Sequence, residues 1–325
     1  MFSKFPKIEL HCHLDGSLPL LFVQQALAEL GETYTTAELT ALLRVPPSCT
    51  SLTQYLQKFD LPIRCLRSPE HLRRAAYAFL ALLAEDHVVY AEVRFAPALL
   101  ATPELDCRQV LECVLDGLRR GSEAFHITAN VIVCAMRHHS EEENLAVIDL
   151  AREYLHAGVC AADLAGDESR YPTAAFAPLF QRAQRLGLPY TIHAGECGSA
   201  ESVRQALALG ARRIGHGIAM GGHPELQKLC AERQIGVELC PISNFHTGAA
   251  QSAASYPLLE FLDSGVCATI NTDNRTVSNT SLTREFEFLS SELGFGQEQF
   301  LQVERNAVMC SFADDATKER LLRLF

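Results

Sequence analysis

Hydrophobic positions along the chain form short runs rich in β-branched residues, and each run is followed by a longer segment with helical spacing. Most runs are almost continuously apolar, which is typical of parallel strands buried on both faces. The predicted strands are Lys7–His13, Val88–Phe95, Ile127–Ala135, Val159–Ala165, Pro189–His193, Arg213–His216, Gly236–Cys240 and Cys267–Thr272. The pattern therefore indicates an α/β protein.

The segments between these runs place apolar residues three and four positions apart, as amphipathic helices do. The predicted helices are Pro69–Ala84, Cys107–Ser122, Glu141–His156, Ala175–Leu186, Glu201–Leu209, Pro224–Glu232 and Tyr256–Asp263. Alternation of eight strands with helices predicts a (β/α)8 TIM-type barrel. A doubly wound sheet is the competing fold, but the chain has no Gly-x-Gly-x-x-Gly turn after its first strand, which favours barrel closure.

The first two strands are separated by more chain than one helix needs. The helical segments predicted there are Leu20–Leu30, Thr36–Leu43 and Leu52–Phe59. We predict that residues 1–325 form a single barrel domain in which residues 18–75 are a helical lid insertion. Insertions at the carboxyl ends of barrel strands often cover the site, although a helical decoration without a lid role is the alternative. The tail, Gln297–Phe325, is predicted to pack as helices under the barrel.

The composition and charge of the chain limit the kinds of protein it can be and the partners it can bind. The chain has 325 residues, 48% hydrophobic and 21% charged, which is a globular balance that excludes disordered and coiled-coil chains. A formal net charge of -11 without a long basic run argues against nucleic acid and anionic membranes as partners. The N-terminus has no apolar signal-peptide core, and the longest apolar run, Ala75–Ala84, is too short for a membrane span.

The chain contains twelve cysteines but no Cys-x-x-Cys motif. Several of them, including Cys134, Cys160, Cys240 and Cys267, lie inside predicted strands. This distribution indicates reduced, buried thiols rather than a disulfide framework. A cytoplasmic location is therefore predicted.

Polar side chains that can bind metal gather at the carboxyl ends of four predicted strands. His11 and His13 are two residues apart in a strand, so both point to the same side, which is the barrel lumen. His193, His216 and Asp273 end strands five, six and eight. Each of these residues, taken alone, is more often an ordinary polar residue at the end of a strand. Together they converge on the face where barrels of this kind carry out chemistry, which indicates a metal site.

One ion is predicted rather than two. A pair of ions in such barrels is often bridged by a modified lysine on the fourth strand, and no Lys occurs between Lys58 and Lys228. The predicted ligands, which leave a position for water, are His11, His13, His193 and Asp273. Cys197 could approach the ion as a soft ligand, but the His and Asp ligands already suffice.

Glu196 and His216 remain near the open side of this predicted site. Glu196 follows His193 through Gly195, which allows a sharp backbone turn. A metal ion lowers the pKa of a bound water toward ~7, so hydroxide is available at neutral pH. A protonated Glu196 can then act as general acid, and His216 can orient or deprotonate the water.

An ordered set of segments over essentially the whole chain resembles the adenosine deaminase family. The segments are HCHLDGS, YLQKFD, EVRFAP, DLAGDE, HAGE, IGHG, ELCPISN and NTD. The resemblance implies zinc-dependent hydrolytic deamination of adenosine and 2′-deoxyadenosine to inosine and 2′-deoxyinosine with release of ammonia, a reaction of purine salvage. It implies one Zn²⁺ ion per chain and a small purine nucleoside as the binding partner.

Matched positions imply a role for each site residue. The residues that resemble the zinc ligands are His11, His13, His193 and Asp273. Glu196 resembles the acid that protonates the purine ring nitrogen beside the amine-bearing carbon, and His216 resembles the residue that positions the attacking hydroxide. The residues that resemble the substrate contacts are His13, Asp15 at the ribose, Phe59 in an apolar lid over Leu52–Phe59, Gly166 through its backbone N–H, and Asn274.

Asn274 departs from the family pattern, because many members carry a second Asp directly after the metal-binding one. An amide can donate directly to a nitrogen of the purine's five-membered ring. The change also leaves open a deaminase of free adenine or of a modified adenine nucleoside such as aminodeoxyfutalosine. Asp15 favours a nucleoside, since relatives that act on the free base or on other conjugates resemble HLEG rather than HLDG at that point.

Other classes of function fit the residues less well. An ester or amide hydrolase on the same fold is disfavoured by the missing bridging lysine and by Glu196. A catalytically silent nucleoside-binding protein is expected to lack Glu196 or a metal ligand, and this chain retains them all. A purely structural barrel would not explain why polar residues converge on one face.

Overall fold

The computed structural model describes residues 2–46, 48–49 and 51–325 and has an α/β fold with eight parallel strands. The strands are β1 (Lys7–His13), β2 (Val88–Phe95), β3 (Thr128–Met136), β4 (Val159–Ala165), β5 (Thr191–Ala194), β6 (Arg213–His216), β7 (Gly236–Leu239) and β8 (Cys267–Ile270). Every pairing between consecutive strands within a sheet is parallel. The eight predicted strands are thus confirmed.

Four strands differ from their predicted bounds. β3 lies one residue further along the chain than predicted, at Thr128–Met136 instead of Ile127–Ala135. β5 begins two residues later than predicted because Pro189 has no N–H to offer a neighbouring strand. β8 ends at Ile270 instead of Thr272, since the Thr272 N–H faces the Glu9 carboxylate, 3.3 Å from each oxygen. β7 ends at Leu239, and Cys240 already precedes a short helix.

The strands form two four-stranded sheets, β1-β2-β3-β4 and β5-β6-β7-β8, which single parallel bridges connect. At one seam the Ala162 N–H donates to the Pro189 carbonyl oxygen at 2.9 Å. At the other, the His13 N–H donates to the Asp273 carbonyl at 2.7 Å and the Asp273 N–H donates to the His11 carbonyl at 2.8 Å. The second seam therefore holds three predicted metal ligands beside one another.

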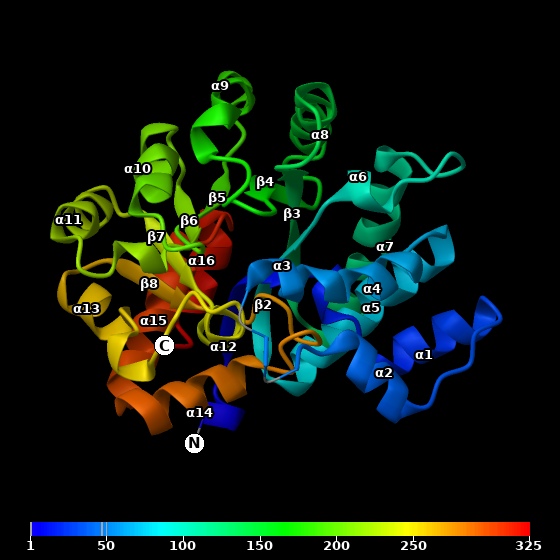
Figure 1. The fold of residues 1–325 in the computed structure, drawn as a ribbon, viewed down its shortest axis with the longest axis horizontal. Helices are drawn as coiled ribbons and strands as arrows, with labels where there is room; N and C mark the ends of the chain where they lie inside the picture. Colours follow the sequence, from blue (N-terminus) through cyan, green and yellow to red (C-terminus); the bar gives the residue numbers. More distant parts are fainter. Residues whose placement is uncertain (1, 47, 50) are drawn as a thin grey trace.

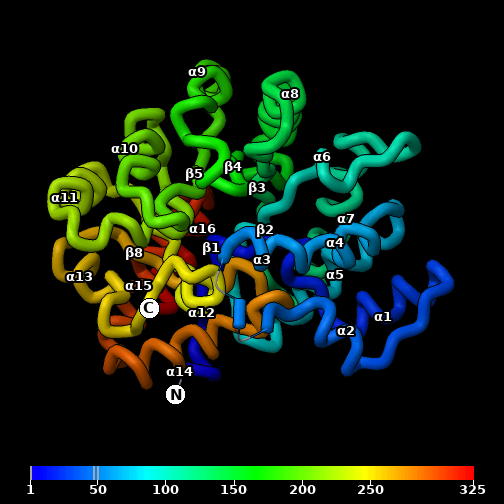
Figure 2. The backbone as a smooth tube through the Cα atoms, in the orientation of Figure 1, coloured from blue at the N-terminus to red at the C-terminus, as the bar shows by residue number. Residues whose placement is uncertain are grey.

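Helices surround the strands in an arc that Figure 1 and Figure 2 show from α8 through α13. The predicted helices are found as α5 (Pro69–Glu85), α7 (Cys107–Phe125), α8 (Glu141–Glu153), α9 (Ala177–Leu186), α10 (Ala200–Ala208), α11 (Pro224–Glu232) and α13 (Leu258–Asp263). The prediction that α8 reaches His156 was wrong. His156 adopts a φ of 68°, a left-handed conformation that does not continue a helix.

Helices that were not predicted include α6 (Pro97–Leu100), α12 (Pro241–His246) and α14 (Leu282–Leu293). The first two start on a proline directly after a strand, which suits the first turn of a helix because proline lacks the N–H that would be unpaired there. Asp86 anchors the start of α14 by accepting a hydrogen bond from the Leu282 N–H at 2.7 Å.

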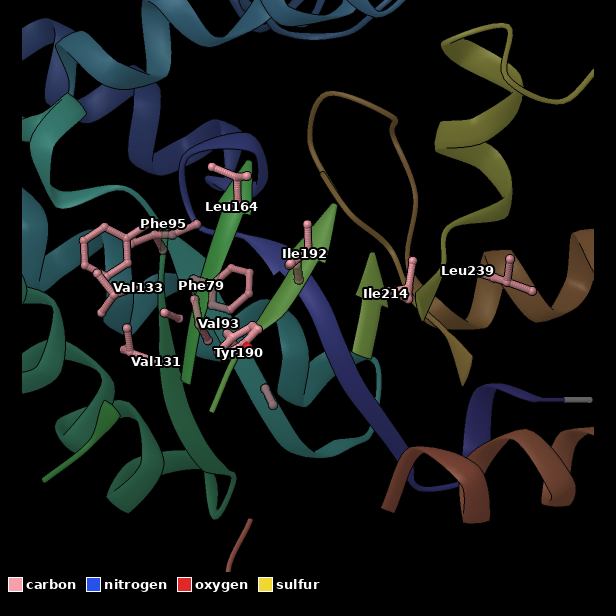
Figure 3. Packing of buried hydrophobic residues seen from close by; sticks show 14 of the residues in the cluster. Phe79, Val93, Phe95, Val131, Val133, Leu164, Tyr190, Ile192, Ile214 and Leu239 are labelled. Carbon is pink, nitrogen blue, oxygen red and sulfur yellow. The ribbon is translucent and has the colours of Figure 1, made fainter. Parts of the chain in front are cut away.

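The hydrophobic core fills the space between the strands and the outer helices. Figure 3 shows side chains of neighbouring strands, such as Val93 and Val131, side by side with Phe79 of α5. These residues are fully buried. Their alternation along the strands leaves the intervening side chains on the opposite face.

That opposite face is charged at several positions, contrary to the expectation of almost continuously apolar strands. Arg94 pairs with Asp163 at 2.9 Å and with Glu238 at 2.8 Å, and Arg213 pairs with Glu92 and with Glu238, both at 2.6 Å. All five side chains are fully buried. Mutual pairing is what allows such charges inside a protein.

The segment after β1 contains α1 (Leu20–Glu29), α2 (Thr36–Leu43), α3 (Leu52–Leu56), the 3₁₀ turn η3 (Gln57–Phe59) and α4 (Asp60–Arg64). Residues 47 and 50 lie outside the described part. α2 starts with a capping box in which Thr35 and Glu38 exchange hydrogen bonds. In Figure 1 and Figure 2, α1 and α2 lie at the edge of the molecule, away from the strands.

The tail forms α15 (Gln297–Cys310) and α16 (Asp315–Leu322). The Glu304 carboxylate accepts a hydrogen bond from the Ile8 N–H at 2.8 Å, and the Asn306 amide donates to the Ala268 carbonyl at 3.0 Å. Ile8 and Ala268 lie near the amino ends of β1 and β8, so α15 packs at the end of the strands opposite the predicted metal ligands. None of the helices in the described ranges has the length and apolar character that crossing a membrane requires.

Candidate active site

A cavity of about 420 Å³ lies at the carboxyl ends of the strands, beside α3 and η3. Most of the site residues predicted from sequence line it. They are His13, Asp15, Phe59, Gly166, His193, Glu196, His216, Asp273 and Asn274. The remaining one, His11, is fully buried beneath them, with its Nε2 atom 3.5 Å from Asp273 Oδ1. The fold therefore brings together residues that are up to 263 positions apart in the chain.

Asp273 directs one carboxylate oxygen at the two N-terminal histidines. Its Oδ2 accepts a hydrogen bond from the Ser243 hydroxyl at 2.6 Å, whereas Oδ1 lies 3.4 Å from His13 Nε2. Burial opposes ionisation, but the close approach of His11 and the other neighbouring imidazoles holds the pKa of Asp273 well below its usual range. Asp273 is thus a carboxylate with one oxygen available to a cation.

His193 completes the cluster from β5. Its Nε2 atom lies 3.3 Å from His13 Nε2, and its Nδ1 atom lies 2.9 Å from Asp163 Oδ2. His11 is held in the same way, because its Nδ1 lies 2.7 Å from Glu238 Oε2. A carboxylate that accepts the Nδ1 proton leaves the Nε2 lone pair free to bind a metal ion.

Arg94 connects these two carboxylates. One of its Nη atoms contacts Asp163 and the other contacts Glu238, so a single guanidinium fixes the partners of both His193 and His11. Our sequence analysis gave Asp163, Glu238 and Arg94 no role. The signal that could have found them is a charged residue in the middle of a strand that is otherwise buried, since such a charge needs a specific partner.

The donor set fits a metal ion. His11 Nε2 is buried and has no hydrogen-bond partner among the described residues, an expensive arrangement that a cation would relieve. Two groups of side chains place ligand atoms close enough to share an ion: His11, His193 and His216, and His11, His13 and Asp273. Cys197 belongs to neither group. Imidazole nitrogens with a carboxylate oxygen are ligands that zinc accepts in tetrahedral sites.

The supporting carboxylate of His193 provides a test of metal binding. We expect Asp163→Asn to weaken zinc binding by about 10- to 100-fold, because the amide stabilises the ligating tautomer and its ring orientation less well. Competition with a chromophoric chelator measures the affinity. Asp149→Asn is the matched control, since Asp149 on α8 forms an exposed ion pair with Arg182 on α9. Equal zinc affinity in the two variants would contradict the role of Asp163.

Glu196 lies at the edge of the cluster, with Oε2 3.7 Å from His216 Nε2. Burial, followed by the charges of Asp273 and Glu168, raises the pKa of Glu196 well above its usual value. Glu168 holds the turn that carries Glu196, since its carboxylate accepts hydrogen bonds from the backbone N–H groups of Gly195 and Cys197. The turn thus presents to the cavity a carboxyl group whose pKa is shifted toward the protonated form.

His216 is oriented by two residues that our sequence analysis did not single out. The Asn244 amide donates to His216 Nδ1 at 3.0 Å, and the Tyr256 hydroxyl donates to the Asn244 carbonyl oxygen at 3.0 Å. Burial, with the neighbouring His11, lowers the pKa of His216 well below its usual value. A neutral ring that accepts at Nδ1 carries its proton on Nε2, the atom that faces Glu196.

Asp15 and Asn274 line the opposite part of the cavity. Burial raises the pKa of Asp15 to about 6. Within the described ranges, Asp15 Oδ1 and Asn274 Oδ1 are buried without a hydrogen-bond partner, so both are available to a polar ligand. A Cβ on Gly16 would lie 1.8 Å from Asn274 Oδ1, which explains why glycine stands between them.

The remaining wall is largely apolar and comes from the segment after β1. Leu52, Leu56 and Phe59 line the cavity together with Tyr55, whose hydroxyl is 2.7 Å from Ser278 Oγ. His138 also lines the cavity. It lies in the turn after β3, and our sequence analysis gave it no role.

Known proteins are similar to this chain over almost its whole length. A family model described as "Adenosine deaminase" matches residues 6–324. A protein of Enterococcus faecalis called adenosine deaminase is 39% identical, covering 98% of this chain and 95% of the relative. One of Streptococcus mutans with the same name is 40% identical, covering 97% and 91%.

Solved structures are similar over the same length. An adenine deaminase from Arthrobacter aurescens has a TM-score of 0.90 at 27% identity, covering 98% of this chain and 97% of that one. A zinc-bound amidohydrolase from Burkholderia ambifaria has a TM-score of 0.88 at 25% identity, covering 98% and 89%. An N6-methyl-AMP deaminase from Arabidopsis thaliana has a TM-score of 0.84 at 26% identity, covering 98% and 96%.

Proposed function

The chain belongs to the adenosine deaminase family, and we propose that it hydrolyses the amino group of adenosine and 2′-deoxyadenosine, giving inosine or 2′-deoxyinosine and ammonia. It is an adenosine deaminase, a hydrolase that acts on a cyclic amidine C–N bond. The observation that carries the chemistry is the position of Glu196, a buried carboxyl group with a raised pKa, beside the His and Asp cluster in one cavity.

The fold supports this proposal because it brings the site residues together around one cavity. We propose that the two sheets form one closed (β/α)8 barrel, because hydrogen bonds between parallel segments occur at both seams. In this proposal residues 1–325 are a single domain and residues 18–75 are its helical lid insertion. Support for the lid comes from Leu52, Leu56 and Phe59, which line the cavity.

A single Zn²⁺ ion is proposed as the cofactor, held by His11, His13, His193 and Asp273. When bound, zinc supplies a water molecule acidic enough to act as a nucleophile at neutral pH. His216 is proposed to orient that nucleophile by donating from Nε2, since the hydrogen bond from Asn244 occupies Nδ1. This assignment chooses between the two roles that the sequence left open for His216.

Glu196 is proposed to donate its proton to the purine nitrogen beside the amine-bearing carbon. Attack on that carbon pushes electrons onto this nitrogen, so a proton delivered there neutralises the developing charge. A carboxylic acid is suited to this only if it stays protonated near neutral pH. The buried surroundings of Glu196 provide that condition.

The substrate contacts are proposed from the opposite wall. Asp15 and His13 bind the ribose, and the Gly166 backbone N–H meets the purine. Gly166 has a φ of 106°, a conformation that favours glycine and brings the backbone to the cavity. Asn274 donates its amide to the five-membered ring of the purine, and Phe59 covers the ligand.

Free adenine and a modified nucleoside such as aminodeoxyfutalosine remain the alternative substrates. Asp15 favours a nucleoside, because its Oδ1 atom is buried without a hydrogen-bond partner among the described residues and can accept a hydrogen bond from a ribose hydroxyl. The alternative from another class, a catalytically silent nucleoside-binding protein, would bind adenosine without releasing ammonia.

One assay separates these functions. The zinc-loaded protein is incubated with adenosine, adenine or aminodeoxyfutalosine, and deamination is followed by the fall in absorbance of the adenine chromophore. The proposal predicts that adenosine is converted faster than adenine or aminodeoxyfutalosine. Tight adenosine binding without any absorbance change, at full zinc occupancy, would leave the silent binding protein as the function.

Gly16→Ala tests the placement of Asn274. The new Cβ overlaps the Asn274 side chain and displaces it, so we expect kcat/KM for adenosine to fall about 100-fold through misplacement of the purine. Gly296→Ala is the control, since the nearest atom to its Cβ is the end of the flexible Gln299 side chain at 3.3 Å. Unchanged steady-state kinetics in Gly16→Ala would mean that Asn274 does not contact the purine.

A cytoplasmic location is proposed on the basis of the cysteines. All twelve are free thiols, and most of them are buried. A reducing compartment keeps such thiols in this state.

A further inference from the structure

A second cavity, of about 460 Å³, lies at the amino ends of β6, β7 and β8, against α15. It is at the end of the strands opposite the proposed zinc ligands, because β8 begins at Cys267 and leads toward Asp273. Two cysteines that are 43 residues apart line it, Cys267 and Cys310. The mechanism above uses neither of them.

The fold holds these two thiols in contact. Cys267 is the first residue of β8 and Cys310 is the last residue of α15. Cys310 Sγ lies 4.0 Å from the Cys267 carbonyl oxygen, and both side chains line the same cavity. The hydrogen bond from Asn306 to the Ala268 carbonyl fixes α15 against β8 one turn before Cys310.

The neighbouring strand provides the space for this pair. A Cβ on Gly236, the first residue of β7, would lie 2.9 Å from Cys310 Sγ and 2.8 Å from its Cβ. Any larger residue at position 236 would push Cys310 away from the strand. The absence of a side chain at Gly236 thus leaves room for Cys310 in its position beside β8.

The two thiols are unequal and partly accessible. Both are only half-buried, in contrast to the fully buried thiols of the core. The neighbouring Cys310 thiol, against the effect of burial, lowers the pKa of Cys267 to about 7. The Cys267 thiol in turn raises the pKa of Cys310. Polar residues such as Arg212 and Asn306 line the cavity, so a small polar oxidant can enter.

We propose that Cys267 and Cys310 form a redox-active dithiol, which hydrogen peroxide converts into an intrachain disulfide between β8 and α15. The site is independent of the active-site cavity.

The reaction balances with peroxide as the only oxidant. The Cys267 thiolate attacks one peroxide oxygen, the O–O bond breaks, and the products are a sulfenic acid and hydroxide. The Cys310 sulfur then attacks the Cys267 sulfur, the S–O bond breaks, and one water leaves as the S–S bond forms. Two thiols are oxidised by two electrons in total, and a small dithiol reverses the reaction by exchange.

Closing this loop stabilises the folded chain, because the crosslink restricts the unfolded ensemble. The oxidised protein is therefore expected to unfold at a higher temperature than the reduced one. Turnover of adenosine is expected to be unchanged, since the disulfide lies at the opposite end of the strands from Glu196.

Peptide mapping of the zinc-loaded, full-length protein tests the proposal. After treatment with a small molar excess of hydrogen peroxide, we expect the disulfide-linked pair of peptides containing Cys267 and Cys310 to dominate, together with a higher Tm that dithiothreitol reverses. Cys310→Ala should abolish both effects. Cys107→Ser, which removes another half-buried thiol at the start of α7, should preserve both.

A second variant, in which Cys310 is unchanged, controls for misfolding of the Cys310→Ala protein. Cys267→Ala should also abolish the linked peptide while leaving Cys310 unoxidised at the same peroxide dose, because the nucleophile is absent. The proposal is overturned if peroxide oxidises the exposed Cys197 while Cys267 and Cys310 stay as thiols. It is equally overturned if the Tm increase persists in either alanine variant.

Discussion

Glu196→Gln is expected to lower kcat for adenosine deamination by about 10³-fold while leaving KM and zinc content close to those of the unaltered protein. The amide has the shape of the acid but cannot deliver a proton to the purine nitrogen, and general acid catalysis contributes in this range. Burial keeps the carboxyl of Glu196 protonated, so the substitution introduces no new charge difference at neutral pH. Steady-state kinetics and metal analysis on the same sample provide the measurement.

Glu201→Gln is the matched control for this change. Glu201 lies five residues further along, in the first turn of α10, and is exposed. It should keep full activity. If Glu196→Gln kept near-normal kcat, another group would have to supply the proton and the proposed mechanism would be wrong.

Asp273→Asn is expected to abolish stable zinc binding and, with it, turnover. A neutral amide replaces the carboxylate whose Oδ1 faces His11 and His13, so the proposed ion loses its only anionic ligand. The backbone conformation around residue 273 should be unchanged, because its two hydrogen bonds with β1 are formed by main-chain atoms. Asparagine also tolerates the φ of 56° at this position.

Zinc content after dialysis and circular dichroism together measure this effect. Asp263→Asn, at the exposed end of α13, is the control and should keep one zinc ion per chain. A folded Asp273→Asn protein that retained zinc with unchanged affinity would show that Asp273 is not a ligand.

The strands and outer helices could be predicted because their apolar spacing is local. β1, β2, β4 and β6 have the predicted bounds, since each run is bordered by a clear change in pattern. α6 and α12 escaped prediction because four to six residues contain too few turns for a helical period. The left-handed conformation of His156, which follows α8, likewise cannot be predicted from the spacing of apolar residues.

The candidate site was predictable to the extent that residues of recognisable chemistry end strands. His11, His13, His193 and Asp273 could be grouped because all carboxyl ends of parallel strands meet on one face. The supporting residues could not be assigned roles in this way. Arg94, for example, gains meaning only from contacts with Asp163 and Glu238, 69 and 144 positions away in the chain.

Asn244 and Tyr256 illustrate the same limit. Asn244 lies 28 residues after His216 in the chain and donates a hydrogen bond to its ring. Tyr256 lies 12 residues further on and donates a hydrogen bond to Asn244. A sequence pattern places His216 at a strand end but does not reveal which ring nitrogen carries the proton. The hydrogen bonds do, and they favour an orienting role for His216.

Anomalous diffraction from crystals of the zinc-loaded protein, collected on both sides of the zinc absorption edge, tests the central claim most directly. The account predicts one anomalous peak per chain, bonded to His11, His13, His193 and Asp273 and close to Glu196. A peak held by His216 in place of His13 and Asp273, or two peaks in the cavity, would contradict it.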